Sequence, residues 1–426
     1  QFLKMAGIAG AAVGASAGLG GLLAACGGEE ETTTTAGATE TTAGATETTA
    51  AGTETTASGE TTTSVAAGAE EGGEIKTAYV IPVTGAMSAF GAAGQWQLDW
   101  FNKNTWKDGI IGGDGKKYKM TAKIYDSQSD SNRSSQVTSD AILNDGAMLV
   151  GASSSAANVI PVAAMAESLE TPGIHYDVPG DAWAAAQTDA GGAYKWNWCS
   201  WWVGKDLVGN FVKMWNLIPH NKTVGALWVN DADGMVFANA LPGLFKELGF
   251  TLVDPGRFEV GTEDFTAIIG QFKKEGVELV CGMANPAEFT NFTKQCAQQS
   301  FKPPVVTCAK AMLFTSAVES LGSLGDGMTM ETWFHPKYPY VSSVTGMSAQ
   351  QYCDAFEADT GQQWTQPICF IGCYELWTDI LQRTKNPMDK LSIVEAIKQT
   401  KIIAAGGPVD WTINPEPRFG FYNFCS

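Results

Sequence analysis

The sequence has few of the residues that metal and nucleic-acid sites need. It contains three His among 426 residues, and neither a HExxH helix motif nor a Cys-x-x-Cys pair. Zinc sites are built from such His and Cys clusters, so a zinc hydrolase is excluded. Lys and Arg number 27 against 45 Asp and Glu, for a net charge of −18. Nucleic acids are bound mainly through Lys and Arg, so a nucleic-acid partner is excluded as well.

The first 28 residues have the layout of a bacterial lipoprotein signal. One cation, Lys4, precedes a long run of small apolar residues that ends in Leu23-Ala24-Ala25-Cys26. A transmembrane helix is the alternative, but Ala and Gly are weakly hydrophobic and the run ends in a small-residue cleavage motif. We therefore expect a signal peptide over 1–25, with acylation of Cys26 that anchors the protein to the outer face of the membrane. The start, Gln1 to Lys4, is similar to half of a twin-arginine export motif.

The composition of residues 26–74 predicts a tether between the lipid anchor on Cys26 and the folded body. The segment repeats motifs such as AGATETT, and residues 29–74 hold ten Glu and no Lys or Arg. No position of the repeat carries a large apolar residue that could form a coiled-coil seam, so we expect this segment to be disordered. A flexible chain of this length spans about 35–40 Å on average, enough to hold the body off a lipid surface.

From Ile75 onward the pattern alternates between strands and helices. Short runs rich in β-branched and aromatic residues are separated by amphipathic stretches of helical length. The expected strands are Thr77–Val83, Met120–Tyr125, Met148–Gly151, Gly173–Tyr176, Val224–Val229, Thr251–Phe258, Leu279–Cys281 and Val305–Thr307. Such alternation predicts an α/β protein with parallel sheets, and the length favours two doubly wound, Rossmann-like lobes. Ligands of open α/β sheets bind beyond the carboxyl ends of the strands.

Two loops after expected strands have the composition of a ligand site. Thr84–Gly91 and Gly151–Ala156 place small hydroxyl residues and free backbone amides at the start of a helix. Such helix starts accept anionic or carbonyl groups, although simple helix capping by Ser153–Ser155 is the alternative. The loop Asn230–Gly234 is similar to part of a calcium loop, but the remaining acidic ligands are missing. We expect neither a metal nor a cofactor.

The order and spacing of several segments resemble one family over residues 75–426. The chain is similar to type I periplasmic solute-binding proteins of the branched-chain amino acid and amide branch, which serve ABC importers. The segments that carry the likeness are PVTGAMSAFGAAG (82–94), YDSQSD (125–130), LVGASSSAANVIPVAAMAE (149–167), KTVGALWVNDADG (222–234), GTEDFTAIIGQFKKEGVELV (261–280), FTKQCAQQSFKP (292–303) and GGPVDW (406–411).

The resemblance implies two lobes joined by a hinge that the chain crosses three times. Lobe 1 would comprise 75–197 plus 334–405, and lobe 2 would comprise 198–333 plus 406–426. Such proteins bind a small solute in the cleft, close over it because the closed state binds it better, and present it to an ABC permease. The ligand loops of relatives fall on Phe90, Ser154, Ser155, Ala156, Tyr176, Asp177, Asp233, Asn285 and Lys310.

Three features depart from the amino-acid binders of this family or leave alternatives open. Relatives often carry Tyr where Phe90 and Asp233 stand. Fourteen Trp are present, and some near expected loops could stack on a ligand ring, although core packing is the alternative. Eight cysteines remain besides Cys26, and we expect Cys281 and Cys308 to be the first candidates for a disulfide if their strands are neighbours.

Lys310 bears on the charge of the ligand. Relatives often have a Glu in this loop that pairs with the ammonium group of an amino acid, whereas a Lys would repel it. A carboxylate ligand could supply the partner that a desolvated Lys needs. An internal pair of Lys310 with Asp233 or Asp177 is the alternative, and it would leave the ligand neutral.

The predicted function is that of an extracytoplasmic, monomeric substrate-binding lipoprotein of an ABC importer. Its ligand would be an amino acid, an amide or a related small acid, aromatic acids included. A ligand-sensing receptor domain of the same fold is the alternative. An enzyme is disfavoured because no Ser/His/Asp order, metal cluster or nucleotide fingerprint is present.

Overall fold

The computed structural model describes residues 68–413. The expected signal peptide, Cys26, most of the expected tether and Cys425 lie outside this range. Among the described residues, every helix is too short or too polar to cross a membrane.

The first sheet has six strands in the order β2-β3-β1-β4-β5-β6. All neighbours are parallel except β2 and β3, which are antiparallel. The strands are β1 (Glu71–Ile81), β2 (Ile110–Ile111), β3 (Lys117–Asp126), β4 (Leu149–Ala152), β5 (Gly173–Tyr176) and β6 (Asn197–Ser200). The second half of β1 is buried on both faces, as expected for a central parallel strand. Its first half alternates between exposed and partly buried residues, and it begins inside the segment expected to be tether.

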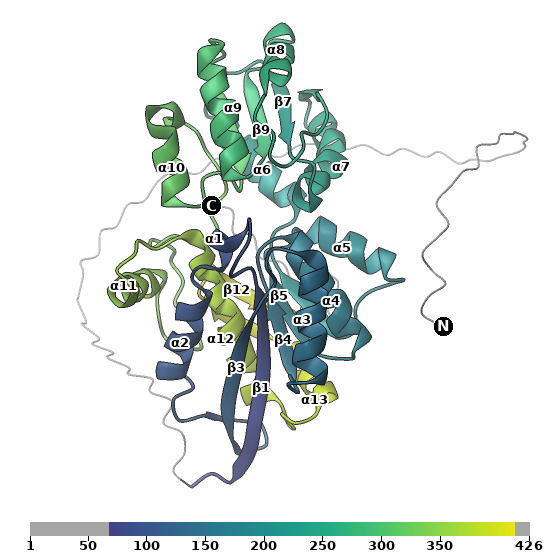
Figure 1. The fold of residues 1–426 in the computed structure, drawn as a ribbon, viewed down its shortest axis with the longest axis vertical. Coiled ribbons are helices and arrows are strands. Elements are labelled where there is room, and N and C mark those ends of the chain that lie inside the picture. The colour runs from purple at the N-terminus through teal and green to yellow at the C-terminus, as the bar shows by residue number, and fades with distance from the viewer. Residues whose placement is uncertain (1–67, 414–426) are drawn as a thin grey trace, which may run out of the picture. The chain divides into compact units, whose positions relative to one another are not determined.

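Helices cover both faces of this sheet. On one face, α3 (Ser131–Leu143) and α4 (Ala156–Ser168) pack side by side (Figure 1). In addition, α12 (Gly372–Arg383) packs against α2 (Gly94–Lys103) and against β5 of this sheet. Two helices that are far apart in the sequence therefore lie together. The remaining helices of this part are α1 (Ser88–Gly91), α5 (Gly180–Asp189), α11 (Ala349–Thr360), the 3-10 helix η2 (Gln366–Ile371) and α13 (Lys390–Ile397).

The second sheet has four parallel strands in the order β10-β9-β7-β8. They are β7 (Thr223–Trp228), β8 (Thr251–Val253), β9 (Leu279–Met283) and β10 (Val305–Ala309). The associated helices are α6 (Gly204–Trp215), α7 (Ala232–Glu247), α8 (Thr266–Lys274), α9 (Pro286–Gln298), α10 (Thr315–Leu321) and the 3-10 helix η1 (Gly322–Gly325). The two parallel sheets with flanking helices confirm the predicted fold class.

The last described strands form an antiparallel pair, β11 (Lys401–Ala404) and β12 (Gly407–Asp410). A turn at Ala405-Gly406 folds the chain back, and β11 packs against α12. Gly407–Asp410, which the sequence assigned to the second lobe, thus pairs with Lys401–Ala404, which it assigned to the first lobe. The lobe boundaries stay a prediction.

The seven cysteines of the described chain are buried and free. The suggested disulfide between Cys281 and Cys308 is wrong, although β9 and β10 are neighbours. Cys281 lies opposite Thr307, and Cys308 lies opposite Gly282. Because successive side chains of a strand point to opposite faces, this register sends the two thiols to different faces of the sheet.

Candidate functional site

A cavity of about 1060 Å³ opens at the carboxyl ends of strands from both sheets. Its wall includes residues that follow β1, β4, β7, β9 and β10, the edge where ligands of parallel α/β sheets bind. Pockets for small molecules commonly measure roughly 300–1,000 Å³. The cavity is therefore large enough for a ligand well above the size of one small amino acid.

The loop after β1 supplies an apolar wall. Asp126, at the end of β3, accepts hydrogen bonds from the amides of Val83 and Thr84 at 2.9 and 3.1 Å and from the Thr84 hydroxyl at 2.6 Å. This anchor fixes the loop that leads into α1, which carries Phe90. The Phe90 ring lies 5.0 Å from that of Phe314, a residue that follows β10, so aromatic side chains associated with both sheets meet at the cavity.

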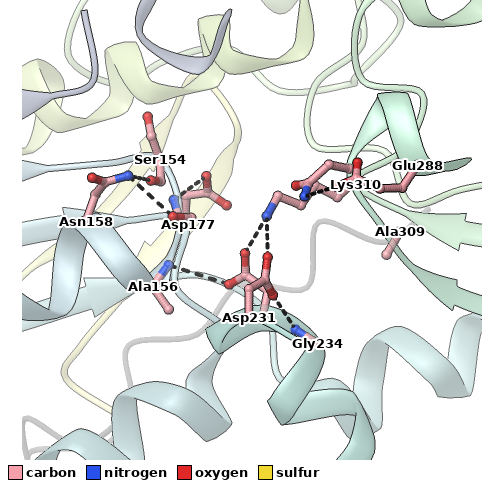
Figure 2. Close-up of polar contacts among 12 residues, drawn as sticks. Ser154, Ala156, Asn158, Asp177, Asp231, Gly234, Glu288, Ala309 and Lys310 are labelled. Atoms are coloured by element: carbon pink, nitrogen blue, oxygen red, sulfur yellow. Dashed lines mark hydrogen bonds and ion pairs between the residues drawn. The ribbon is translucent and has the colours of Figure 1, made fainter. Parts of the chain in front are cut away.

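The turn before α4 has an unusual backbone. Ser154 and Ser155 have φ values of 82° and 78°, in the left-handed region that residues with a side chain seldom adopt. Asp177 Oδ2 accepts the Ser155 amide at 3.0 Å, and Asp233 Oδ1 accepts the Ala156 amide at 3.5 Å (Figure 2). Strained residues of this kind concentrate at functional sites. Two amides expected to be free for a ligand are thus occupied by carboxylates of the protein itself.

Lys310 forms an internal ion pair. Its Nζ lies 2.7 Å from Asp233 Oδ2 and 3.6 Å from Asp231 Oδ2, so two carboxylates flank one ammonium group (Figure 2). Asp231 also caps α7 by accepting the Gly234 amide at 2.9 Å. Of the two alternatives that the sequence left open for Lys310, the internal pair is the one found. Asp231 and Asp233, which gave their loop its likeness to a calcium site, both engage this lysine.

Burial and neighbouring charges both shift the pKa values of this cluster. Burial lowers the pKa of Lys310, but Asp233 and Asp231 outweigh this effect and the net shift is upward. Burial raises the pKa of Asp231 against the opposing effect of Lys310. The pKa of Asp177 is raised well above its ordinary value by burial and then by Asp233. Lys310 therefore stays protonated, whereas Asp177 is biased toward its neutral form.

Glu331 contacts Lys310 but does not line the cavity. Its Oε1 accepts the Lys310 amide at 3.0 Å and the Trp333 indole N–H at 3.1 Å, whereas Oε2 is buried without a hydrogen-bond partner among the described residues. Burial raises the pKa of Glu331 to about 7. The described residues contain no group of three or more His, Cys, Asp or Glu side chains placed to hold a metal ion.

A family model described as "Periplasmic binding protein" matches residues 74–417. The chain belongs to this family. Membership of the periplasmic binding protein family implies an extracytoplasmic location.

Solved structures of periplasmic binding proteins share the fold. A leucine-binding protein from Thermotoga maritima is 17% identical with a TM-score of 0.66, over 79% of this chain and 91% of that chain. A solute-binding protein of an ABC transporter from Rhodopseudomonas palustris BisB5, in complex with 3,4-dihydroxybenzoic acid, is 17% identical with a TM-score of 0.66, over 81% and 90%. A fatty acid ABC transporter substrate-binding protein from Thermomonospora curvata is 14% identical with a TM-score of 0.65, over 81% and 86%.

The expected ligand-loop residues of this periplasmic binding protein divide into two groups. Phe90, Ser155, Asp233, Asn285 and Lys310 line the cavity. Ser154, Ala156, Tyr176 and Asp177 are buried and do not line it. Within the second group, Asp177 holds the Ser155 amide, and Tyr176 packs against Trp201 and Phe370. A direct role in ligand binding stays a prediction for the first group, and the second group supports the wall.

Sequence reasoning missed several residues at this site. Asp231, Glu288, Asn158 and Phe314 line the cavity, and Glu331 lies behind Lys310. Asp231 could have been found from its position two residues before Asp233, at the start of the same helix.

Six of the seven Trp residues considered for ligand stacking are core residues, and the seventh, Trp196, is partly buried. Trp183, Trp198, Trp201, Trp202, Trp228 and Trp333 are at most 2% exposed, and the cavity wall described here contains no Trp. Packing, the alternative that the sequence left open, is therefore what the structure shows for them.

Proposed function

We propose that this protein is the substrate-binding subunit of an ABC importer, which captures a small solute and delivers it to a permease. The observation that carries the proposal is the cavity between elements of two parallel sheets, at the carboxyl ends of their strands. A solute that contacts both sides stabilises the closed arrangement over the open one, so binding itself signals occupancy to the permease. No covalent step is needed for this function.

The wall of the cavity favours a solute with a sizeable apolar part. Phe90 and Phe314 form one side together with Met87 and several Ala side chains, and charged groups gather near Lys310. Apolar walls with a few placed polar groups are typical of small-molecule sites, where the polar groups fix orientation. Relatives with this fold include complexes with an aromatic acid and with isoleucine. An amphipathic solute fits this pattern.

The N-terminal sequence supports attachment to the membrane. Leu23-Ala24-Ala25-Cys26 directs cleavage before Cys26 and acylation of its thiol and new amino group. Two points of lipid attachment give stable anchoring, whereas a single chain gives only marginal binding. We assign the protein to the outer face of the cell membrane as a monomer that reaches its permease on a tether.

A thermal-shift screen tests the binding function. The purified full chain is mixed with amines, amino acids, amides, aromatic acids and sugars, and a ligand specific to the folded state raises the melting temperature. Ala89→Trp provides a blocked variant, because Ala89 is exposed and lines the cavity. Ala358→Trp is the matched control, because Ala358 is an exposed helical residue outside the cavity wall.

The expected result is a ligand that stabilises the parent chain and Ala358→Trp but not Ala89→Trp. The proposal would be contradicted if no class of compound raised the melting temperature. It would also be contradicted if a compound raised the melting temperature of Ala89→Trp as much as that of the parent chain. Deleting the gene then separates transport from sensing. Loss of import of the identified solute supports transport, whereas normal import with a lost transcriptional response would support the sensor.

A further inference from the structure

The cavity carries more negative than positive groups at its polar end. Three carboxyl side chains, Asp231, Asp233 and Glu288, line it, whereas Lys310 is the one basic residue in the wall over residues 68–413. Charges removed from water need a partner of opposite sign. A single ammonium group cannot balance the charge of these carboxylates. A second positive group is therefore favoured at this end of the cavity.

The three carboxylates differ in how fully they are engaged. Asp233 uses Oδ2 for Lys310 and Oδ1 for the Ala156 amide. Glu288 Oε1 accepts the Gly261 amide at 2.9 Å and faces the Asn285 amide group at 3.4 Å. Both side chains are thus held by the protein, and both residues are buried.

Asp231 is the one of the three that is only partly buried, and one of its oxygens has no close partner among the described residues. Its Oδ1 accepts the Gly234 amide, but its Oδ2 lies 3.6 Å from Lys310 Nζ, beyond hydrogen-bond distance. Its side chain is 23% exposed, against 8% for Asp233, and it lines the cavity. Asp231 Oδ2 is therefore an acceptor that a ligand can reach.

The groups that could receive a ligand carboxylate are already occupied. The Ser155 amide donates to Asp177, the Ala156 amide faces Asp233, and Lys310 is paired (Figure 2). A carboxylate placed here would also lie beside Asp231 and Asp233, which repel it. The polar end of the cavity thus disfavours the head group that the sequence had suggested for Lys310.

We propose that the ligand carries a protonated amine as its polar head, without a carboxylate, and that Asp231 is the residue that selects it. The apolar body of this amine lies against Phe90 and Phe314. This inference rests on the proposed function, because it assigns the ligand class of the same cavity.

Matched probes on one skeleton test the charge of the head group. Tryptamine, indole-3-propionamide and indole-3-propionate present a cation, a neutral amide and an anion on the same apolar body. Phenethylamine, 3-phenylpropanamide and 3-phenylpropanoate do the same on a smaller body. Binding of each probe to the full chain is measured by isothermal titration calorimetry at neutral pH.

Asp231→Asn tests the selecting residue. Asn caps helices as well as Asp, so it still accepts the Gly234 amide while losing the negative charge. Asp254→Asn is the matched control, because Asp254 is exposed, lies outside the cavity wall and likewise accepts a glycine amide, that of Gly256. We expect the amine to bind more tightly than the amide and the acid. Asp231→Asn should weaken amine binding about 10- to 100-fold, and Asp254→Asn should leave it unchanged.

The outcomes separate this inference from the proposed function. If an acid binds most tightly and Ala89→Trp blocks it, the inference is wrong and the binding function stands. Unchanged amine affinity in Asp231→Asn also overturns the role of Asp231. If no probe and no compound of the broad screen binds, both the inference and the proposed function fail. The head group of any ligand found in the broad screen decides the ligand class in the same way.

Discussion

Lys310 Nζ lies 2.7 Å from Asp233 Oδ2, and both side chains are less than 10% exposed. The two residues follow different strands of one sheet. Lys310 comes directly after β10, whereas Asp233 lies in the first turn of α7, the helix after β7. Through its other oxygen, Asp233 also faces the Ala156 amide at the start of α4. This chain of contacts links the elements of both sheets across the cavity.

Replacing Lys310 by Met should destabilise the protein strongly. The variant leaves Asp233 buried without its cation, and breaking a buried pair in this way costs about 3–5 kcal/mol. Urea denaturation of Lys310→Met is compared with that of Lys205→Met, which removes an exposed lysine from α6. The double variant Lys310→Met/Asp233→Asn should recover part of the loss, because the uncompensated charge is gone. Equal stability of Lys310→Met and the parent would show that the pair does not contribute.

The raised pKa of Glu331 predicts how the stability of the protein depends on pH. Burial raises the pKa of its carboxyl from 4.5 to about 7 in the folded state, so the folded protein binds the extra proton between these values. Stability from this group is present below pH 4.5 and is lost as the pH rises through 7. The loss is on the order of 3 kcal/mol.

Glu331→Gln tests this prediction because Gln does not ionise and can still accept hydrogen bonds through Oε1. The variant should gain stability over the parent as the pH rises from 5 to 8. Subtracting the two curves removes the shared titration of Asp177, Asp231 and Lys310. Parallel curves over this range would contradict the raised pKa.

The regular part of the fold could be predicted because burial and periodicity agree there. Fully buried runs such as Leu149–Ala152 and Val305–Ala309 are recognisable as central parallel strands. β6 (Asn197–Ser200) was missed, since it lies in a Trp-rich stretch without alternation. The pair β11 and β12 was missed because its strands are short and part of a local turn.

The candidate site was easiest to predict where a residue follows directly from a strand. Lys310 and Asn285 come within two residues of β10 and β9, so their position at the cavity follows from topology. Whether a residue faces the cavity or lies behind it depends on side-chain direction, which separates Ser155 from Tyr176. Glu331 was out of reach, because a long irregular segment brings it behind Lys310.

Gly234 and Gly243 offer a matched test within α7. A Cβ on Gly234 would lie 1.8 Å from the Val229 carbonyl oxygen, whereas a Cβ on Gly243 meets no atom within 4 Å. Gly234→Ala should force the helix start that carries Asp231 and Asp233 away from β7 and destabilise the protein by more than 2 kcal/mol, on the scale of overpacking. Gly243→Ala should stabilise it by about 0.5–1 kcal/mol, because Ala favours helices. Thermal unfolding measures both, and equal effects would contradict the close packing at Gly234.

Cys26→Ser tests the lipid anchor. Acylation requires the thiol, so we expect the variant to be released or misprocessed, whereas Cys425→Ser should behave like the parent. Fractionation of cells followed by mass measurement of the membrane-bound protein gives the answer. A Cys26→Ser protein that is fully membrane-bound and of mature size would show that the lipoprotein interpretation is wrong.

The start of β1 defines how much of the N-terminal region can be removed. Residues 27–67 contain Val65 as their one large apolar residue, so they have almost nothing with which to pack against the body. Glu71–Glu74, in contrast, pair with Lys117–Lys119 of β3, and the Glu74 carboxylate accepts the Thr121 hydroxyl at 2.6 Å and Lys119 Nζ at 3.0 Å. Deleting 27–67 should therefore change the free energy of unfolding by less than about 0.5 kcal/mol.

Deleting 27–74 should lower stability further, by about 1–2 kcal/mol, because each lost ladder hydrogen bond contributes about 1 kcal/mol and exposed ion pairs add little. Urea denaturation of the two deletion variants at one ionic strength separates these effects. Two identical curves would mean that the first residues of β1 do not contribute to the sheet. A large loss in the shorter deletion would instead mean that residues 27–67 contact the body.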